Sequence, residues 1–268
     1  MAEARSDSIY LLQLTDCHLM PQPGQLFRHI DVDLQLAQVV DHLVANGQPI
    51  DHLLLTGDLV HHGGADAYLR LLDILAPLPG ERHWIPGNHD EIDAMRAATS
   101  MPCGQEEVDL GYWRLLLLDS TSHPDGRGSG SLSEEELRWL QQRLAQSPER
   151  PVLIALHHNP LSTASDWQDQ IMLANTAAFT ELVQSAPQVK AVICGHLHQA
   201  QSRRIGQAQF WCSPSTSVQF RPAQADFLLE TEGPDARPGY RWYRLDADGG
   251  IESGLERVGP VAQGSELG

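Results

Sequence analysis

The chain is poor in positive charge and has no long apolar segment. Its 268 residues include 18 Lys and Arg against 35 Asp and Glu, which gives a formal net charge of −17 with neutral histidine. A balance this acidic argues against a protein that grips nucleic-acid phosphates or an anionic membrane surface. No apolar run approaches the ~18 residues that a membrane-spanning helix needs. We therefore expect neither a nucleic-acid partner nor a membrane partner.

Cysteine is also scarce, and its spacing excludes a disulfide framework or a Cys-rich zinc site. The four cysteines are scattered without a CxxC pair: Cys17, Cys103, Cys194 and Cys212. In a chain of this size such cysteines are expected to be reduced. The apolar run at residues 9–14 lacks a small-residue cleavage site and is followed at once by charge, so it does not resemble a signal peptide. We expect a cytoplasmic protein.

The chain has enough apolar residues to bury a core. Hydrophobic residues make up 41% and charged residues 20%, and we find neither an internal repeat nor a linker long enough to separate domains. We expect one domain over residues 1–268, with a flexible tail at 258–268. The oligomeric state stays open, because an exposed C-terminal strand would be able to pair two copies.

The hydrophobic pattern alternates short strands with amphipathic helices over the first two-thirds of the chain. Strands are predicted at residues 9–14, 52–56, 82–85, 113–118, 152–156 and 189–194, and helices at 31–46, 65–75, after 90, 133–146 and 175–184. Ser133 and Glu136 form the sequence pattern of a capping box. After residue 200 the pattern favours shorter antiparallel strands, at 202–205, 209–212, 226–230 and 240–245. The pattern thus predicts an α/β protein with a mostly β final third.

Chemically active residues follow five of the predicted strands. The motifs are Asp16-Cys17-His18, Gly57-Asp58, Gly87-Asn88-His89-Asp90, His157-His158 and Gly195-His196-Leu197-His198. The carboxyl ends of strands in α/β sheets border the crevice where ligands bind. We therefore expect these Asp, Asn and His side chains to meet at one edge.

The residue types and spacing in these motifs predict a metal site. In extended backbone residues i and i+2 point the same way, so Asp16 and His18 should share a face while Cys17 turns away to pack. Oxygen and imidazole ligands without thiolate suit Mn, Fe, Zn or Co. The candidates exceed the needs of one tetrahedral zinc, so two metal ions that share a carboxylate are expected.

The complete motif series resembles that of the calcineurin-like metallophosphoesterases. Three further stretches resemble the bacterial class III 3′,5′-cyclic-AMP phosphodiesterases: His157-His158-Asn159-Pro160, residues 194–199 and residues 214–220. This resemblance covers nearly the whole chain. It implies a four-layer α/β/β/α sandwich of two mixed sheets.

The resemblance also implies a ligand set. The first metal ion would be held by Asp16, His18, Asp58 and His198, and the second by Asp58, Asn88, His157 and His196. Iron and manganese are the expected metals, with zinc or cobalt as alternatives. Substrate contacts are expected at His18, Asp58, Asn88, His89 and His198.

The implied reaction is hydrolysis of 3′,5′-cyclic AMP to 5′-AMP by a metal-bridging hydroxide, which would lower cyclic-AMP signalling. His89 is the candidate acid for the leaving 3′-oxygen, and Asp90 is expected either to orient His89 through a hydrogen bond or to cap the helix that follows. One alternative is a broad phosphodiesterase acting on 2′,3′-cyclic nucleotides or other small diesters. Another is a non-catalytic metal-binding scaffold, against which the complete set of candidate ligands argues.

Several residues near the motifs have no assigned role. We expect His158 to point away from the metals and Cys17 to pack in the core. His61 and His62 are expected in a solvated loop. Arg28 and residues 215–220 lie where they would border the nucleotide, but the sequence does not assign them a role.

Overall fold

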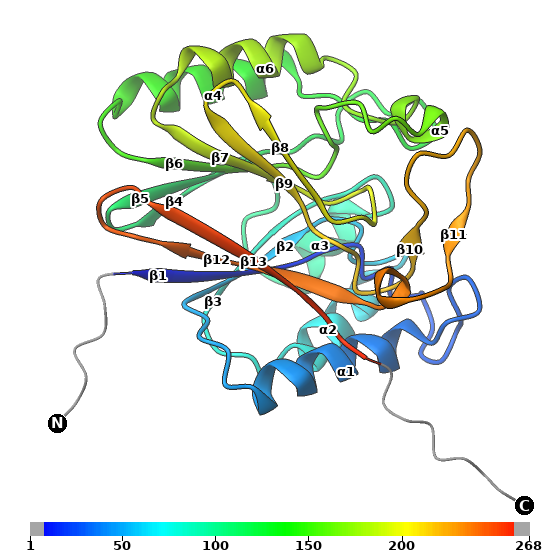
Figure 1. The fold of residues 1–268 in the computed structure, drawn as a ribbon. Coiled ribbons are helices and arrows are strands. Elements are labelled where there is room, and N and C mark those ends of the chain that lie inside the picture. The colour runs from blue at the N-terminus through cyan, green and yellow to red at the C-terminus, as the bar shows by residue number, and fades with distance from the viewer. Residues whose placement is uncertain (1–7, 260–268) are drawn as a thin grey trace, which may run out of the picture.

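The fold is described here for residues 8–259 of a computed structural model. Two β-sheets lie face to face, and helices cover the outer face of each (Figure 1). This is the four-layer α/β/β/α arrangement that the resemblance implied.

The first sheet has five strands in the order β13-β12-β1-β2-β3. Its strands are β1 (Ile9–Leu14), β2 (His52–Thr56), β3 (Glu81–Ile85), β12 (Gly239–Leu245) and β13 (Ile251–Arg257). Strands β1, β2 and β3 run parallel, whereas β12 and β13 are antiparallel additions. The sheet is therefore mixed, and three of the five motifs follow its parallel strands β1, β2 and β3.

The second sheet has six strands in the order β4-β5-β6-β7-β9-β8. Its strands are β4 (Glu106–Leu110), β5 (Trp113–Leu117), β6 (Val152–Ala155), β7 (Val189–Cys194), β8 (Gln201–Ile205) and β9 (Ala208–Cys212). Strand β9 pairs in parallel with β7, so the expectation that the late strands would all be antiparallel is wrong here. A separate pair is formed by β10 (Gln219–Phe220) and β11 (Leu229–Glu230).

Helices pack on the outer faces through apolar stripes. Helices α1 (Val32–Ala45) and α2 (Ala65–Ile74) lie below the first sheet, and α4 (Glu134–Gln146) and α6 (Thr176–Ser185) lie above the second (Figure 1). Helix α3 (Ile92–Ala98) packs through Met95 into the same apolar cluster as α1 and α2. The short elements are α5 (Asp166–Asp169) and the 3₁₀ turn η1 (Pro234–Ala236). Between the sheets a third apolar layer contains side chains from both, such as Leu54 and Leu115. Each helix–sheet layer and the centre thus have their own apolar core.

Two edge strands were not predicted from the sequence. Strand β4 reads Glu-Glu-Val-Asp-Leu, and acidic residues have low strand propensity. Charged residues are nevertheless common on edge strands, where they discourage pairing with other chains. Strand β13 contains Gly254, which lies opposite Trp242; an added Cβ there would come 2.2 Å from the indole. The glycine therefore makes room for the aromatic ring of the neighbouring strand.

Two further predictions differ from the structure. Only Leu229–Glu230 of the predicted strand 226–230 forms a strand. Within the predicted tail, Val258 is 4% exposed and its N–H donates to the carbonyl of Pro238 (2.8 Å). Residues 260–268 of that tail lie outside the described residues. Among the described residues, no helix has the length and apolar character to span a bilayer.

Candidate metal centre

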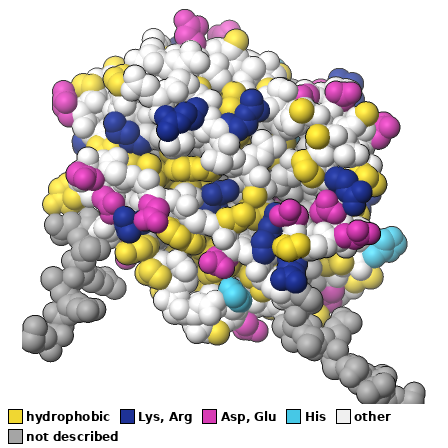
Figure 2. Space-filling view, in the orientation of Figure 1, with side chains coloured by type: hydrophobic (Ala, Val, Ile, Leu, Met, Phe, Trp, Pro, Cys, Tyr) yellow, Lys and Arg dark blue, Asp and Glu magenta, His cyan; other side chains and the backbone are white. Residues whose placement is uncertain are grey.

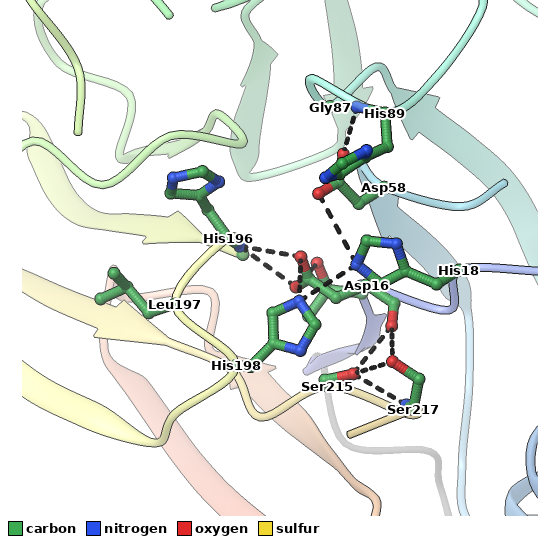
Figure 3. Close-up of polar contacts among 12 residues, drawn as sticks. Asp16, His18, Asp58, Gly87, His89, His196, Leu197, His198, Ser215 and Ser217 are labelled. Atoms are coloured by element: carbon green, nitrogen blue, oxygen red, sulfur yellow. Dashed lines mark hydrogen bonds and ion pairs between the residues drawn. The ribbon is translucent and has the colours of Figure 1, made fainter. Parts of the chain in front are cut away.

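The five predicted motifs meet at one place, where the parallel strands of both sheets end. Asp16 and His18 follow β1, Asp58 follows β2, and Asn88 follows β3. From the second sheet, His157 follows β6, and His196 and His198 follow β7. Figure 3 shows Asp16, His18, Asp58, His196 and His198 converging from opposite sides. The expected gathering of these side chains is therefore present.

The backbone at the candidate ligands is left-handed rather than extended. The φ angle is +52° at Asp16, +49° at His18, +50° at Asp58, +69° at His196 and +49° at His198. Our expectation that strand alternation would align Asp16 with His18 was therefore wrong in its geometry, although both side chains do point into the centre. Non-glycine residues in this region are strained, and such strain concentrates at functional sites.

Asp16, His18 and His198 form one group of potential ligands. Nε2 of His198 lies 3.1 Å from Nε2 of His18 and 3.4 Å from Oδ1 of Asp16. All three side chains are at most 2% exposed. One ligand atom from each lies within 4.8 Å of the others, a spacing that would suit a single metal ion.

Asp58 connects this group with a second one. Its Oδ2 lies 3.7 Å from Nε2 of His18 and 3.3 Å from Nε2 of His157. Nε2 of His157 in turn lies 3.3 Å from Nδ1 of His196. The Asp58 carboxylate thus faces histidines of both groups, which is the position a bridging ligand needs.

The ring orientations show which nitrogens are available as ligands. Nδ1–H of His157 donates to the carbonyl of Thr56 (2.8 Å), and Nε2–H of His196 donates to the carbonyl of Ile171 (3.0 Å). In a neutral ring the other nitrogen then carries only a lone pair. Those two lone pairs face each other across 3.3 Å. They repel unless a proton or a cation lies between them, and a metal ion bound there would take the place of the proton.

His198 follows the same rule. Its Nδ1–H donates to the carbonyl of Val218 (2.7 Å), which leaves the Nε2 lone pair towards His18 and Asp16. Backbone carbonyls commonly fix the tautomer of metal-binding histidines in this way.

Asn88 supplies a further observation that fits a metal. Its Oδ1 is buried and has no hydrogen-bond partner in the structure. A buried polar atom without a partner is costly, and each case needs an explanation. A cation at the end of the amide would provide one.

The ionisable side chains of the centre shift one another's pKa values. Burial opposes a charge on His157, yet the adjacent Asp58 carboxylate raises the pKa of His157 to about 10. Burial likewise opposes ionisation of Asp58, but His157 holds the pKa of Asp58 well below its usual value. Burial and the charge of His157 lower the pKa of His196 to about 3. Without a metal ion, Asp58 is therefore an anion, His157 is protonated and His196 is a neutral imidazole. A metal ion would have to displace the proton of His157, as ligands bind in their deprotonated form.

Two glycines allow the backbone to approach the centre closely. A Cβ at Gly195 would lie 2.1 Å from Oγ1 of Thr15, and one at Gly87 would lie 2.3 Å from Oδ1 of Asp58. Real Cβ atoms do not make contacts this short. The glycines in these motifs are therefore required by space.

His89 lies at the rim of the centre. Its backbone N–H donates to Oδ1 of Asp58 (2.8 Å), and its Nδ1 lies 3.0 Å from Nε2 of His62. The ring also stacks on His61, with centroids 4.4 Å apart. Within the described residues, the hydrogen bond that we expected between Asp90 and the ring of His89 is not formed.

Asp90 instead ties two loops together. Its carboxylate accepts the N–H groups of Leu59, Val60 and Gly87 and the hydroxyl of Tyr68, at 2.9–3.1 Å for the shortest contact of each. It is not the helix cap either, because α3 has Glu91 at its N-cap. Asp90 therefore holds the loop that carries Asn88 and His89 against the loop that carries Asp58.

The structure assigns other histidines more clearly than the sequence did. His61 is half-buried, with its Nδ1 3.2 Å from Nδ1 of His18, so placing it in a solvated loop was wrong. His62 is exposed, as expected. His158 is buried, and its nitrogens contact the Ser120 hydroxyl and the Gly128 carbonyl, as a structural residue would. It does not point away from the centre, however, because one of its nitrogens lies within 4.8 Å of ligand atoms of His157 and His196.

Cys17 packs in the core beneath the first sheet, as expected. Burial raises the pKa of its thiol to about 12. Arg28 lies with its guanidinium 4.8 Å from the ring centroid of Phe227.

Sequence reasoning missed several supporting residues. Ser215 and Ser217 both donate hydroxyl hydrogen bonds to the carbonyl of Asp16, at 2.7 and 2.8 Å (Figure 3). Phe27 stacks on His18 and Phe220 stacks on His198, with centroids 4.4 and 4.0 Å apart. These contacts join positions far apart in the chain, so no local sequence pattern signals them.

Comparisons of the sequence with a family model and with known proteins both point to the calcineurin-like phosphoesterases. Residues 9–200 match the family described as calcineurin-like phosphoesterase. The 3′,5′-cyclic adenosine monophosphate phosphodiesterase CpdA of Pseudomonas aeruginosa is 38% identical over 259 residues, which is 96% of this chain and 93% of that protein. The protein of the same name from Escherichia coli K12 is 33% identical and covers 93% of this chain and 90% of its own length.

Solved structures agree on the fold. A dimetal phosphatase from Danio rerio aligns with a TM-score of 0.63 at 15% identity, covering 94% of this chain and 99% of its own. At this identity the likeness concerns the fold alone.

Proposed function

Because the chain belongs to the calcineurin-like phosphoesterase family, we propose that it is a metal-dependent phosphodiesterase that hydrolyses 3′,5′-cyclic AMP to 5′-AMP and so lowers cyclic-AMP signalling. The observation that carries this proposal is the similarity to named cyclic-AMP phosphodiesterases over nearly the whole chain. The gathered Asp, Asn and His side chains supply the chemistry that such a reaction needs.

We propose that Asp16, His18, Asp58 and His198 hold one metal ion. The second would be held by Asp58, Asn88, His157 and His196. The arrangement is supported by the ring nitrogens of His157 and His196, which face each other 3.3 Å apart, and by the unpartnered Oδ1 of Asn88. Iron and manganese are the proposed metals, since the donor set of carboxylate, amide and imidazole suits both.

When bound, two such ions would supply positive charge that acidifies a water molecule and offsets the charge on the phosphoryl oxygens. The protein's own residues orient the reacting groups. His18, Asp58, Asn88, His89 and His198 are the proposed substrate contacts. Because they converge from both sheets, they would position the diester, and positioning of this kind contributes strongly to catalysis.

His89 is the proposed donor of a proton to the leaving 3′-oxygen. Nδ1 of His89 contacts His62, which leaves Nε2 of His89 for the substrate. Asp90 acts indirectly, because its carboxylate fixes the backbone of the loop that presents His89.

We propose the cytoplasm as the compartment and a small cyclic nucleotide as the partner. All four cysteines are free in the structure, as expected of a protein in a reducing compartment.

The decisive test is product identification with purified protein loaded with manganese. The substrates are 3′,5′-cyclic AMP, 2′,3′-cyclic AMP and bis(p-nitrophenyl) phosphate, each with a chelated control. We expect chelator-sensitive formation of 5′-AMP, faster from 3′,5′-cyclic AMP than turnover of the other two. A preference for either other substrate would retain the metal chemistry and refute the signalling role. Absence of turnover with metals bound would point to a scaffold.

A further inference from the structure

A second group of potential metal ligands lies at the opposite end of the first sheet. His52 begins β2, and Glu81 and His83 lie on β3. The candidate metal centre follows the far ends of the same strands, about 20 Å away by the rise of an extended chain. We propose that these three residues, called the edge cluster below, form a separate binding site for one divalent transition-metal ion of the zinc type.

The distances within the edge cluster match those of a metal site. Nδ1 of His52 lies 3.2 Å from Nε2 of His83 and 3.9 Å from Oε2 of Glu81. One ligand atom from each residue lies within 4.8 Å of the others. In tetrahedral zinc with bonds of about 2.0–2.1 Å, neighbouring ligand atoms are about 3.3 Å apart. The two histidine nitrogens already have that separation.

The sheet register explains why these residues meet. His52 pairs directly with Glu81, and Leu54 pairs with His83. Since alternate residues share a face, all three cluster side chains lie on the face that carries Leu54 and Ile85 towards the second sheet. The cluster therefore sits where the apolar layer between the sheets opens at the edge strand β3.

The surroundings of the edge cluster are negative. Asp51 and Glu81 both act on His52, and Glu106 of the facing strand β4 is close enough to Glu81 for their charges to repel. Burial lowers the pKa of both His52 and His83, so both rings are neutral at pH 7. Neutral imidazoles beside uncompensated carboxylates are the chemistry that Zn²⁺ prefers.

A hydrogen bond between the two rings is the simpler explanation of the 3.2 Å contact. In that bond Nδ1–H of His52 donates to Nε2 of His83 and also faces the Glu81 carboxylate, so a divalent ion could replace this one proton among the same three acceptor atoms. Glu81 is 69% exposed, so its carboxylate can close on an ion without disturbing the core, while His83 is only 4% exposed and stays fixed. Exposure on the Glu81 side would give water access to a bound ion.

An ion at the edge cluster would link β2 and β3. It would stabilise the folded chain without contacting the candidate metal centre, because a ligand that binds only the folded state shifts the unfolding equilibrium. This inference does not depend on phosphodiesterase activity.

The test is the zinc content of the full chain after dialysis against buffered Zn²⁺. Wild type is compared with His52→Gln and Glu81→Gln, and with His42→Gln as a control on the surface of α1. We expect both cluster variants to hold one zinc ion fewer per chain than wild type and the control. Their phosphodiesterase activity should match wild type, which verifies folding and an intact centre.

Equal zinc content in wild type and His52→Gln would overturn the proposal. In crystals grown with zinc, an anomalous peak bonded to His52 and His83 would support it, and a zinc-loaded centre without that peak would refute it. If instead the proposed function is wrong, wild type and all variants would lack phosphodiesterase activity, while the cluster variants would still hold one zinc ion fewer than wild type.

Discussion

Asn88 and His89 are neighbours in the chain but have different partners. The buried Oδ1 of Asn88 has no hydrogen-bond partner, whereas the His89 ring lies at the rim against His61 and His62. Substitutions at the two positions should therefore separate loss of metal from loss of proton transfer.

For Asn88→Ala we expect loss of metal as well as activity. Removal of the amide oxygen takes away a proposed ligand. Even the loss of a group that only supports a ligand lowers metal affinity or activity 10- to 100-fold. Activity should fall by more than about 100-fold, with reduced metal per chain after dialysis. Full metal content in this variant would remove Asn88 from the ligand set.

For His89→Ala we expect metal content to remain at the wild-type level while turnover of 3′,5′-cyclic AMP falls by about 10²–10⁴. Bis(p-nitrophenyl) phosphate should lose much less, because a nitrophenolate leaves without needing a proton. Comparing kcat for the two substrates is the measurement. An equal loss for both substrates would contradict a role in protonating the leaving group.

At the scale of elements, the start of helix α4 differs from the sequence pattern. Ser133 caps the helix by accepting the N–H of Glu136 (3.0 Å), as expected. The Glu136 carboxylate does not complete a capping box: it accepts the N–H of Asp119 and an amide hydrogen of Gln105. Helix α4 is thereby attached to the loop after β5.

Glu136 should make stability depend on pH. Burial, which outweighs its two hydrogen bonds, raises its pKa to about 7 from 4.5. Between those values the folded chain holds a proton that the unfolded chain has lost, so the free energy of unfolding falls as pH rises from 4.5 to 7. The loss is at most about 3 kcal/mol. Glu136→Gln should flatten this dependence in urea denaturation at pH 5, 6, 7 and 8; an unchanged slope would contradict it.

The loop after β7 depends on the absence of a side chain at Gly195. Gly195→Ala should displace Thr15 and with it Asp16, because the added Cβ would lie 2.1 Å from Oγ1 of Thr15. We expect reduced metal content and more than about 10-fold lower activity. Gly64→Ala is the matched control, since nothing lies within 4 Å of its added Cβ. Equal metal content in the two variants would show that the loop adapts.

At the scale of the whole molecule, the candidate metal centre joins the two sheets. Asp16, Asp58 and Asn88 come from the first sheet, and His157 and His196 come from the second. Metal ions bound between them would cross-link the two halves of the sandwich.

Removal of metal should therefore lower thermal stability as well as activity. A ligand at 100 times its Kd contributes about 2.7 kcal/mol, so chelation should lower Tm by about 5 °C or more in a chain of this size. Calorimetry of the manganese-loaded protein with and without chelator measures this. An unchanged Tm after verified metal removal would contradict the cross-link.

The acidic net charge of the chain affects which molecules its surface attracts. In the face that Figure 2 shows, Lys and Arg side chains are interspersed with Asp and Glu. The formal net charge of −17 disfavours association with polyanions such as nucleic acids.

The sequence by itself determined the alternation of strands and helices and the order of the metal-site motifs. Both are local: the hydrophobic period predicted β1 and β7 at their observed bounds, and each motif follows its strand directly. The edge strands β4 and β13 were not predicted, because charged residues in β4 and a glycine in β13 weaken the local strand pattern. Their pairing is fixed by neighbours more than a few residues away.

Only the tertiary structure decided contacts between distant segments. It determines which nitrogens of His157 and His196 face the centre. It also places His61 against His18 and His52 beside His83. The carboxylate of Asp90 binds the backbone of two loops, which the sequence did not indicate. Such contacts depend on sheet register and on backbone angles at strand ends. Neither is encoded in the residue spacing of a single segment.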